Sequence, residues 1–186
     1  MTIDEKLKAF FEGKKVVILG FGREGRSTLK LLGSCNCKSI TVADMNPVPE
    51  SEAEGCTLCC GEDYLTCLDD CDIIMKAPGV ILKSIVSDEI KAKITSQTDL
   101  FLRFCDNMII GITGTKGKST TSSLIKIFIE KSGKDTMLIG NIGVPPLERR
   151  EEFTKDCVIV CEMSCHQLEY CLLYTSPSPR DYAASR

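Results

Sequence analysis

The segment with the most specific chemistry is the run from Thr113 to Thr120, TGTKGKST, which lies between an apolar segment and a helix-like segment. It matches a short variant of the phosphate-binding loop G-x-x-x-x-G-K-[ST], because Ile112 stands where the full pattern has glycine. Backbone amides from Gly114 onward can surround a β-phosphate, the Lys118 ammonium can neutralise phosphate oxygens, and the Ser119 hydroxyl can bind Mg²⁺. The run therefore predicts an ATPase-type site.

A magnesium-binding phosphate loop commonly has a carboxylate at the end of a neighbouring buried strand. Glu162 follows the apolar run CVIVC, residues 157–161, and precedes a serine-containing turn. We interpret Glu162 as that partner, with a helix-start or surface residue as the alternative. Lys116 adds a second cation to the loop, for which a solvated surface role is the alternative.

A second glycine pattern, G-x-G-x-x-G, spans Gly20 to Gly25 and directly follows an apolar, β-branched segment. Glycines here allow the backbone to approach a diphosphate at the beginning of a helix, whose amides and dipole attract anions. Asp44, at the end of the next strand-like segment, is suited to bind a ribose hydroxyl, as in NAD-binding proteins. The pattern alone leaves three interpretations open: NAD, another nucleotide diphosphate, or glycines that only permit close helix–strand packing.

Composition argues against several other classes of protein. The 186 residues are 43% hydrophobic and 26% charged, with a net charge of −3, which disfavours a nucleic-acid partner. The N-terminus mixes charges of both signs without the apolar region of a signal peptide, and no apolar run is long enough for a membrane span. We therefore expect a cytoplasmic protein with no membrane contact.

Cysteine is unusually frequent, with 12 residues, and histidine occurs once, as His166. In a reducing compartment the cysteines are expected to be free thiols that fill apolar space, although the close pairs Cys35/Cys37 and Cys56/Cys59 leave metal binding as an alternative. His166 has no partner in a nucleophilic pattern, so we assign it no catalytic role.

These residues must be positioned by alternating strands and helices, a pattern that predicts an α/β fold with parallel sheets. We predict strands at 16–19, 39–43, 71–75, 108–113, 136–139 and 156–162, and helices at 27–32, 84–93, 98–105, 119–131 and 167–171. For residues 98–105 a strand is the alternative. Two strand–glycine–helix openings, near residues 20 and 114, predict two units. We place the first domain at 1–105, the second at 106–171, and an unstructured or foreign tail at 172–186.

Four segments in order resemble the Mur ligase family: VVILGFGREGRST (16–28), IIGITGTKGKSTTSSLI (109–125), GNIGVP (140–145) and CEMSCHQLE (161–169). The phosphate loop followed by G-N-I-G and E-x-S-x-x-Q-L is specific, and the leading GFGREG separates the chain from folate-polyglutamating relatives. The resemblance implies a Rossmann-like domain that binds a UDP-linked substrate rather than NAD, followed by the start of a P-loop ATPase-type Mur ligase central domain.

The same resemblance implies ATP and Mg²⁺ as cofactors, and UDP-N-acetylmuramoyl-L-alanine and D-glutamate as substrates of a ligase that forms an amide through an acyl phosphate in peptidoglycan synthesis. Lys118 and Glu162 would be catalytic, and Ser119 and Glu162 would bind the metal. The nucleotide would be bound by Gly114, Thr115, Lys116, Gly117, Lys118, Ser119, Thr120 and Asn141. The UDP-linked substrate would be bound by Gly22, Arg23, Glu24, Asp44, Ser164 and Gln167, with Asp44 facing the uridine and the last two near the muramoyl group.

Members of the family are much longer, with a third domain for the incoming amino acid and, after the E-x-S segment, a carbamylated lysine and a metal-binding histidine. None of these is found in this sequence. We therefore expect the front part of such a ligase, monomeric and without turnover on its own, with residues after about 106 less stable than the first unit. The alternatives are a nucleotide-binding module or regulatory fragment, and an NAD-dependent oxidoreductase.

Overall fold

The computed structural model describes residues 1–82, 86–141, 144–168 and 171, and within them the chain forms two parallel sheets. The first sheet has the order β3-β2-β1-β4-β5 and the second the order β6-β8-β7. The strands are β1 (Lys15–Leu19), β2 (Ser39–Asp44), β3 (Thr57–Cys60), β4 (Ile73–Lys76), β5 (Ile94–Thr95), β6 (Ile109–Ile112), β7 (Thr136–Gly140) and β8 (Val158–Glu162). The predicted α/β class with parallel sheets is confirmed.

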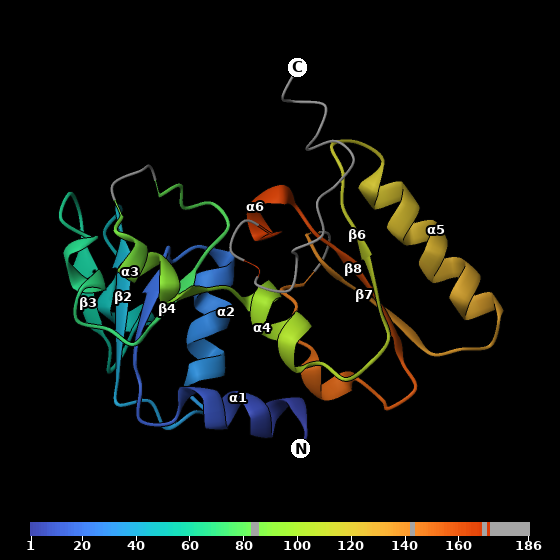
Figure 1. Ribbon diagram of the computed structural model, residues 1–186, viewed down its shortest axis with the longest axis horizontal. Coiled ribbons are helices and arrows are strands. Elements are labelled where there is room, and N and C mark those ends of the chain that lie inside the picture. The colour runs from blue at the N-terminus through green and yellow to red at the C-terminus, as the bar shows by residue number, and fades with distance from the viewer. Residues whose placement is uncertain (83–85, 142–143, 169–170, 172–186) are drawn as a thin grey trace.

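The helices surround and separate the two sheets (Figure 1). They are α1 (Ile3–Phe11), α2 (Arg23–Leu32), α3 (Asp88–Ala92), α4 (Gln97–Phe104), α5 (Lys118–Lys131) and α6 (Cys165–Leu168), with short 3-10 turns η1 (Glu50–Glu52), η2 (Thr66–Leu68) and η3 (Arg150–Glu152). Local capping explains where several begin: Thr2 and Glu5 form a reciprocal capping box at α1, and the Ser96 hydroxyl accepts a hydrogen bond from the Asp99 amide at α4.

Sequence periodicity located most of these elements and misplaced some of their ends. The strand predicted at 71–75 begins at Ile73, and the helix predicted at 27–32 begins earlier, at Arg23. The helix predicted at 167–171 begins earlier, at Cys165, directly after the cap at Ser164, and residues 169–170 of that prediction lie outside the described residues. Helix α1 and the short strands β3 and β5 were not predicted. The domain limits stay predictions, and the tail at 172–186 lies outside the described residues.

Strand register brings the carboxyl ends of each sheet together. Leu19 of β1 lies between Ala43 of β2 and Lys76 of β4, and Glu162 of β8 lies opposite both Ile112 of β6 and Gly140 of β7. The chain leaves β1 toward β2 on one side and later returns to β4 on the other, so the order reverses beside β1. Ligands of open α/β sheets bind in the crevice at the carboxyl ends, where the order reverses.

One hydrophobic cluster extends through both sheets, with α4 between them. It joins Phe11 and Ile18 of the first unit to Phe101 of α4 and to Ile139 and Ile159 of the second sheet. The Phe101 ring packs edge-on against Phe153, with 6.0 Å between centroids. The two sheets therefore share a core, and their relative position is fixed by apolar packing.

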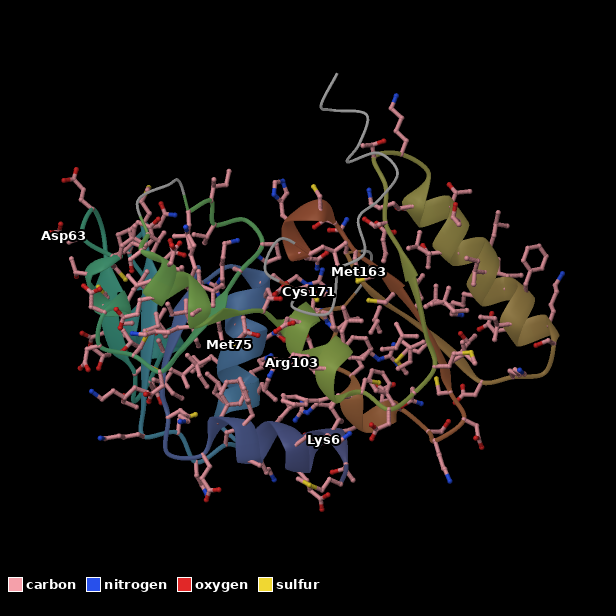
Figure 2. All side chains as sticks on the ribbon, viewed as in Figure 1. Lys6, Asp63, Met75, Arg103, Met163 and Cys171 are labelled. Carbon is pink, nitrogen blue, oxygen red and sulfur yellow. The ribbon has the colours of Figure 1, made fainter. Side chains whose placement is uncertain are left out.

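Polar contacts reinforce the same junction. Figure 2 shows Arg103 between the two halves of the molecule and Lys6 below it on α1. The Arg103 guanidinium lies 5.3 Å from the Phe10 ring centroid, while the Lys6 ammonium lies 2.6 Å from Asp106. Arg150, from η3, pairs with Asp4 of α1. These contacts tie the N-terminal helix to α4 and to the segments that precede β6 and β8.

Helix α5 is only partly covered. Its apolar side chains Leu124, Ile127 and Phe128 are 48%, 42% and 67% exposed, and the one buried residue on the helix is Ser122. Within the described part of the chain, no helix combines the length and apolar character needed to cross a bilayer.

We predict weaker protection of the second sheet in native-state hydrogen exchange. Strand β8 is buried, but its neighbours β6 and β7 are both edge strands and are largely half-exposed, whereas β1 and β4 are almost wholly buried. The amides of β6–β8 should therefore exchange at least about tenfold faster than those of β1 and β4. Mass spectrometry of peptides from each sheet measures this, and equal protection of the two sheets would contradict it.

Candidate functional site

The phosphate loop lies between the end of β6 and the beginning of α5. Gly114 and Gly117 have φ angles of +146° and +77°, conformations that L side chains rarely adopt, so glycine is needed at both positions. Lys118 begins α5, and its ammonium donates a hydrogen bond of 2.8 Å to the Gly114 carbonyl. The loop thus ends at a helix N-terminus, where backbone amides attract anions. Thr115, Lys116, Ser119 and Thr120 are exposed.

Glu162 is 1% exposed and lies beside this loop at the end of β8. Its carboxylate accepts a hydrogen bond of 3.4 Å from the Ser122 hydroxyl and one of 3.2 Å from the Asn141 amide group. Gly140 makes this arrangement possible, because a Cβ there would lie 2.1 Å from the Glu162 carbonyl oxygen. The carboxylate is therefore held from two elements, α5 and the turn after β7.

This arrangement fits a Mg²⁺–nucleotide. Ser119 precedes Ser122 by three residues, so the two face similar directions on α5 and Ser119 lies on the side of the helix toward Glu162. The described residues contain no group of three His, Cys, Asp or Glu side chains that could hold a metal. Mg²⁺ does not need one, since it usually keeps several waters and takes one or two carboxylates with the phosphates.

The first glycine loop is fixed by contacts of its own backbone. The Phe21 amide donates a hydrogen bond of 2.6 Å to Asp44, and the Phe21 carbonyl accepts one from Arg26. A Cβ on Gly25 would lie 2.2 Å from the Gly20 carbonyl oxygen, so glycine allows α2 to begin directly against the loop. Burial raises the pKa of Asp44, but hydrogen bonds from the Phe21 and Asn46 amides outweigh it and leave that pKa below its usual value.

A cavity of about 660 Å³ joins the carboxyl ends of the two sheets. This volume is typical of small-molecule sites. Its lining includes the predicted substrate residues Gly22, Arg23, Glu24, Asp44 and Gln167 together with Asn141, and adds Gly20, Met45, Asn46, Tyr64, Ala77, Pro78, Gly79, Val80, Ile81, Gly140 and Pro145. Asn141 thus lines the cavity and also contacts Glu162, so the cavity lies next to the phosphate loop.

Ser164 is the predicted substrate residue that does not line this cavity. Its hydroxyl accepts a hydrogen bond from the Gln167 amide, and its own amide donates one of 2.8 Å to the Gln167 side chain. The pair therefore caps α6 and holds Gln167 toward the cavity. His166 is exposed and lines a cavity of about 10 Å³ with Lys76 and Gln167, the size of a single water.

Two features near the cavity were not found from the sequence. Lys76, at the end of β4, is 4% exposed, and Gln97 donates hydrogen bonds to the Thr28 hydroxyl and the Glu24 carbonyl. The sequence does contain a signal for Lys76, because a lysine that follows the apolar residues of a buried strand such as β4 is unusual. Apart from Cys171, the described cysteines are free thiols.

Glu24, in the first turn of α2, has an unusually high pKa for a carboxyl group. Burial raises its pKa from 4.5 to about 7, against the opposing effects of a hydrogen bond from the Gln97 backbone and the charge of Lys76. The folded protein therefore contains comparable amounts of the neutral and the charged carboxyl near pH 7.

We predict that the raised pKa of Glu24 makes the folded protein less stable as the pH rises. Because the folded-state pKa of Glu24, about 7, is above the unfolded value of 4.5, the folded state binds more protons between these limits. The free energy of unfolding should fall by about 2 kcal/mol across this range relative to Glu24→Gln, which cannot titrate. Urea denaturation of both proteins at several pH values measures the difference, and parallel stability curves would refute the prediction.

Comparison with known proteins gives one family. The model described as "Mur ligase middle domain" matches residues 112–178. The chain is 35% identical over 173 residues to a UDP-N-acetylmuramoylalanine–D-glutamate ligase of Clostridium botulinum (strain Loch Maree / Type A3), covering 88% of this chain and 38% of that protein. It is 33% identical over 164 residues to the protein of the same name from Shouchella clausii (strain KSM-K16), covering 84% and 36%. The chain thus spans well under half the length of these relatives.

Among solved structures, a chain of HcgC from Methanococcus maripaludis, cocrystallized with SAH and pyridinol, aligns at a TM-score of 0.34 and 16% identity. It covers 64% of this chain and 46% of that one. A likeness this weak carries no functional argument.

Proposed function

The chain belongs to the Mur ligase family, and from this membership we propose that it binds a UDP-linked substrate and ATP–Mg²⁺ for an ATP-dependent ligase that adds D-glutamate to UDP-N-acetylmuramoyl-L-alanine. The observation that carries the proposal is the position of Asn141, which lines the large cavity and donates a hydrogen bond to Glu162 beside the phosphate loop. A substrate in the cavity would thus lie next to a nucleotide on the loop. A cytoplasmic location is part of the proposal.

In this reaction the substrate carboxylate attacks the γ-phosphorus of ATP, which releases ADP and leaves an acyl phosphate. The amine of D-glutamate then attacks the acyl carbon, loses a proton, and displaces phosphate from a tetrahedral intermediate. Bound Mg²⁺ would neutralise charge on the transferring phosphoryl group. The contributions of this chain would be positioning and charge: Lys118 on the phosphate oxygens, Ser119 and Glu162 toward the metal, and the α5 amides around the phosphates.

The cavity is proposed to hold the UDP of the substrate at the first glycine loop. Gly22, Arg23 and Glu24 line it at the beginning of α2, where a diphosphate is stabilised by the helix amides. Asp44 lines it too, and its contact with the Phe21 amide keeps the loop in the observed shape. Gln167 lines the same cavity on the side of the second sheet and is proposed to contact the muramoyl group, with Ser164 acting through it.

We predict that UDP-N-acetylglucosamine, a stand-in for the substrate, protects the first glycine loop from limited proteolysis and that NAD does not. Asp44→Ala should weaken binding about tenfold or more, because the Phe21 amide loses its acceptor and the loop loses its shape. Asp63→Ala is the matched control, since Asp63 is exposed at the edge of the molecule (Figure 2) and does not line the cavity. Protection by NAD alone would favour an oxidoreductase and overturn the proposal.

A separate prediction concerns the phosphate loop. Lys118→Met should reduce the affinity for ATP–Mg²⁺ by about tenfold or more, because the ammonium at the start of α5 no longer neutralises phosphate charge. Lys131→Met, at the other end of the same helix, changes the net charge equally and should bind ATP almost normally. Isothermal titration calorimetry with ATP and Mg²⁺ compares the two. Equal losses in both variants would show that the loop does not bind the nucleotide.

The second candidate function is a nucleotide-binding module without ligase activity, which is favoured by one observation: both glycine loops lead directly into a helix N-terminus, where a nucleotide could bind whether or not a reaction follows. Incubation with UDP-N-acetylmuramoyl-L-alanine, D-glutamate, ATP and Mg²⁺ separates the candidates. Robust product from this chain would exclude the binding-module function. Binding of both nucleotides without product would support it for this chain.

A further inference from the structure

Glu24 lies at the point of the cavity where a diphosphate is proposed to bind. It is the second residue of α2, which begins at Arg23 after the cap residue Gly22. The amides and dipole of this turn attract an anion. A charged carboxylate in the same turn would repel that anion, so the protonation state of Glu24 controls the charge that the ligand meets.

The groups around Glu24 come from five elements. Lys76 of β4 contributes a nearby positive charge, and α4 contributes the Gln97 backbone amide. Arg23 and Asp44, from α2 and β2, share the cavity with Glu24. Two further titratable groups lie on the adjoining elements: His166 of α6 lines the small cavity beside Lys76, and Asp99 of α4 accepts hydrogen bonds from Thr95 and Arg103.

The balance of these groups favours neither charge state of Glu24 strongly. Its pKa is raised to about 7, because burial outweighs the Gln97 hydrogen bond and the charge of Lys76. Asp44, at the same cavity, has a pKa below its usual value and is therefore charged at neutral pH. One carboxyl of the pair can thus change its protonation near neutrality while the other keeps its charge.

We propose that Glu24 takes up a proton when a nucleoside diphosphate ester binds the first glycine loop, and that the neutral carboxyl then donates a hydrogen bond toward the diphosphate. The bound anion favours the neutral form of Glu24, and proton uptake removes the repulsion within the first turn of α2. Binding weakens as the pH rises, because above neutrality a proton must be taken from solution. This inference rests on the proposed UDP site.

The test is calorimetric titration of the intact chain with UDP-N-acetylglucosamine. The diphosphate in this ligand is esterified at both ends, so it has no ionisation of its own near neutral pH. Titrations at about pH 7 in buffers of different ionisation enthalpy give the number of protons bound with the ligand. We expect roughly half a proton at this pH, and an affinity that falls about tenfold between pH 6 and pH 9.

Three variants identify the group responsible. Glu24→Gln keeps the size of the side chain and its ability to donate a hydrogen bond but cannot titrate, so its binding of the ligand should show no proton uptake and little change with pH. Glu89→Gln replaces an exposed glutamate in the first turn of α3 and should leave proton uptake unchanged. His166→Asn removes the sole histidine, the other side-chain type that titrates near neutrality, and should also leave it unchanged.

The outcomes separate this inference from the proposed function. Binding of UDP-N-acetylglucosamine without buffer-dependent enthalpy in the wild type overturns the proton uptake and leaves the UDP site standing. Proton uptake that survives Glu24→Gln in a folded variant, or disappears in His166→Asn, also overturns it by assigning the proton to another group. Absence of any UDP-N-acetylglucosamine binding overturns both proposals.

Discussion

The shared hydrophobic core around α4 is the constraint on which the site depends. Each sheet presents its functional groups at the carboxyl ends of its strands, but these edges form one cavity only if the sheets keep a fixed relative position. Phe101 and Leu100 of α4 are fully buried in the cluster that contains Phe11 on one side and Ile159 on the other. Apolar burial around α4 therefore holds the first glycine loop opposite Asn141 and Gln167, and no direct contact between them is needed to fix this arrangement.

The same junction carries an unusual concentration of buried polar groups. Residues 95–99 (Thr95, Ser96, Gln97, Thr98 and Asp99) are all at most 7% exposed. Within the described part of the chain, the Gln97 side-chain oxygen and the Thr98 hydroxyl have no hydrogen-bond partner, and each such group costs about 1–3 kcal/mol. Gln97 nevertheless holds the first turn of α2 through the Glu24 carbonyl, so part of this polar layer orients the glycine loop. The buried polar groups of residues 95–99 thus lower the stability of the fold at the same place where they orient the wall of the cavity.

Sequence patterns predicted what is local and missed what depends on tertiary approach. The phosphate loop, the G-x-G-x-x-G loop and most strands are encoded in short runs of residues, and the structure has the expected strands and helices there. The position of Asn141 against Glu162 depends on the register of β7 with β8, and the position of Lys76 near Glu24 depends on that of β4 with β1. No short pattern contains these pairings. Nor does periodicity say which apolar residues of a helix are covered, as exposed Phe128 on α5 illustrates.

Two carboxyl groups that line the cavity, Asp44 and Glu24, have pKa values shifted in opposite directions. Asp44 receives two backbone amides, and these hydrogen bonds stabilise its charged form despite burial. Glu24 is buried more deeply with one backbone hydrogen bond and the charge of Lys76, which together do not offset its desolvation. A charged Asp44 is needed where it binds the loop amide, whereas a neutral Glu24 is needed where an anion approaches the helix N-terminus. The depth of burial and the number of amide donors therefore decide together which carboxyl group can become neutral next to a negatively charged ligand.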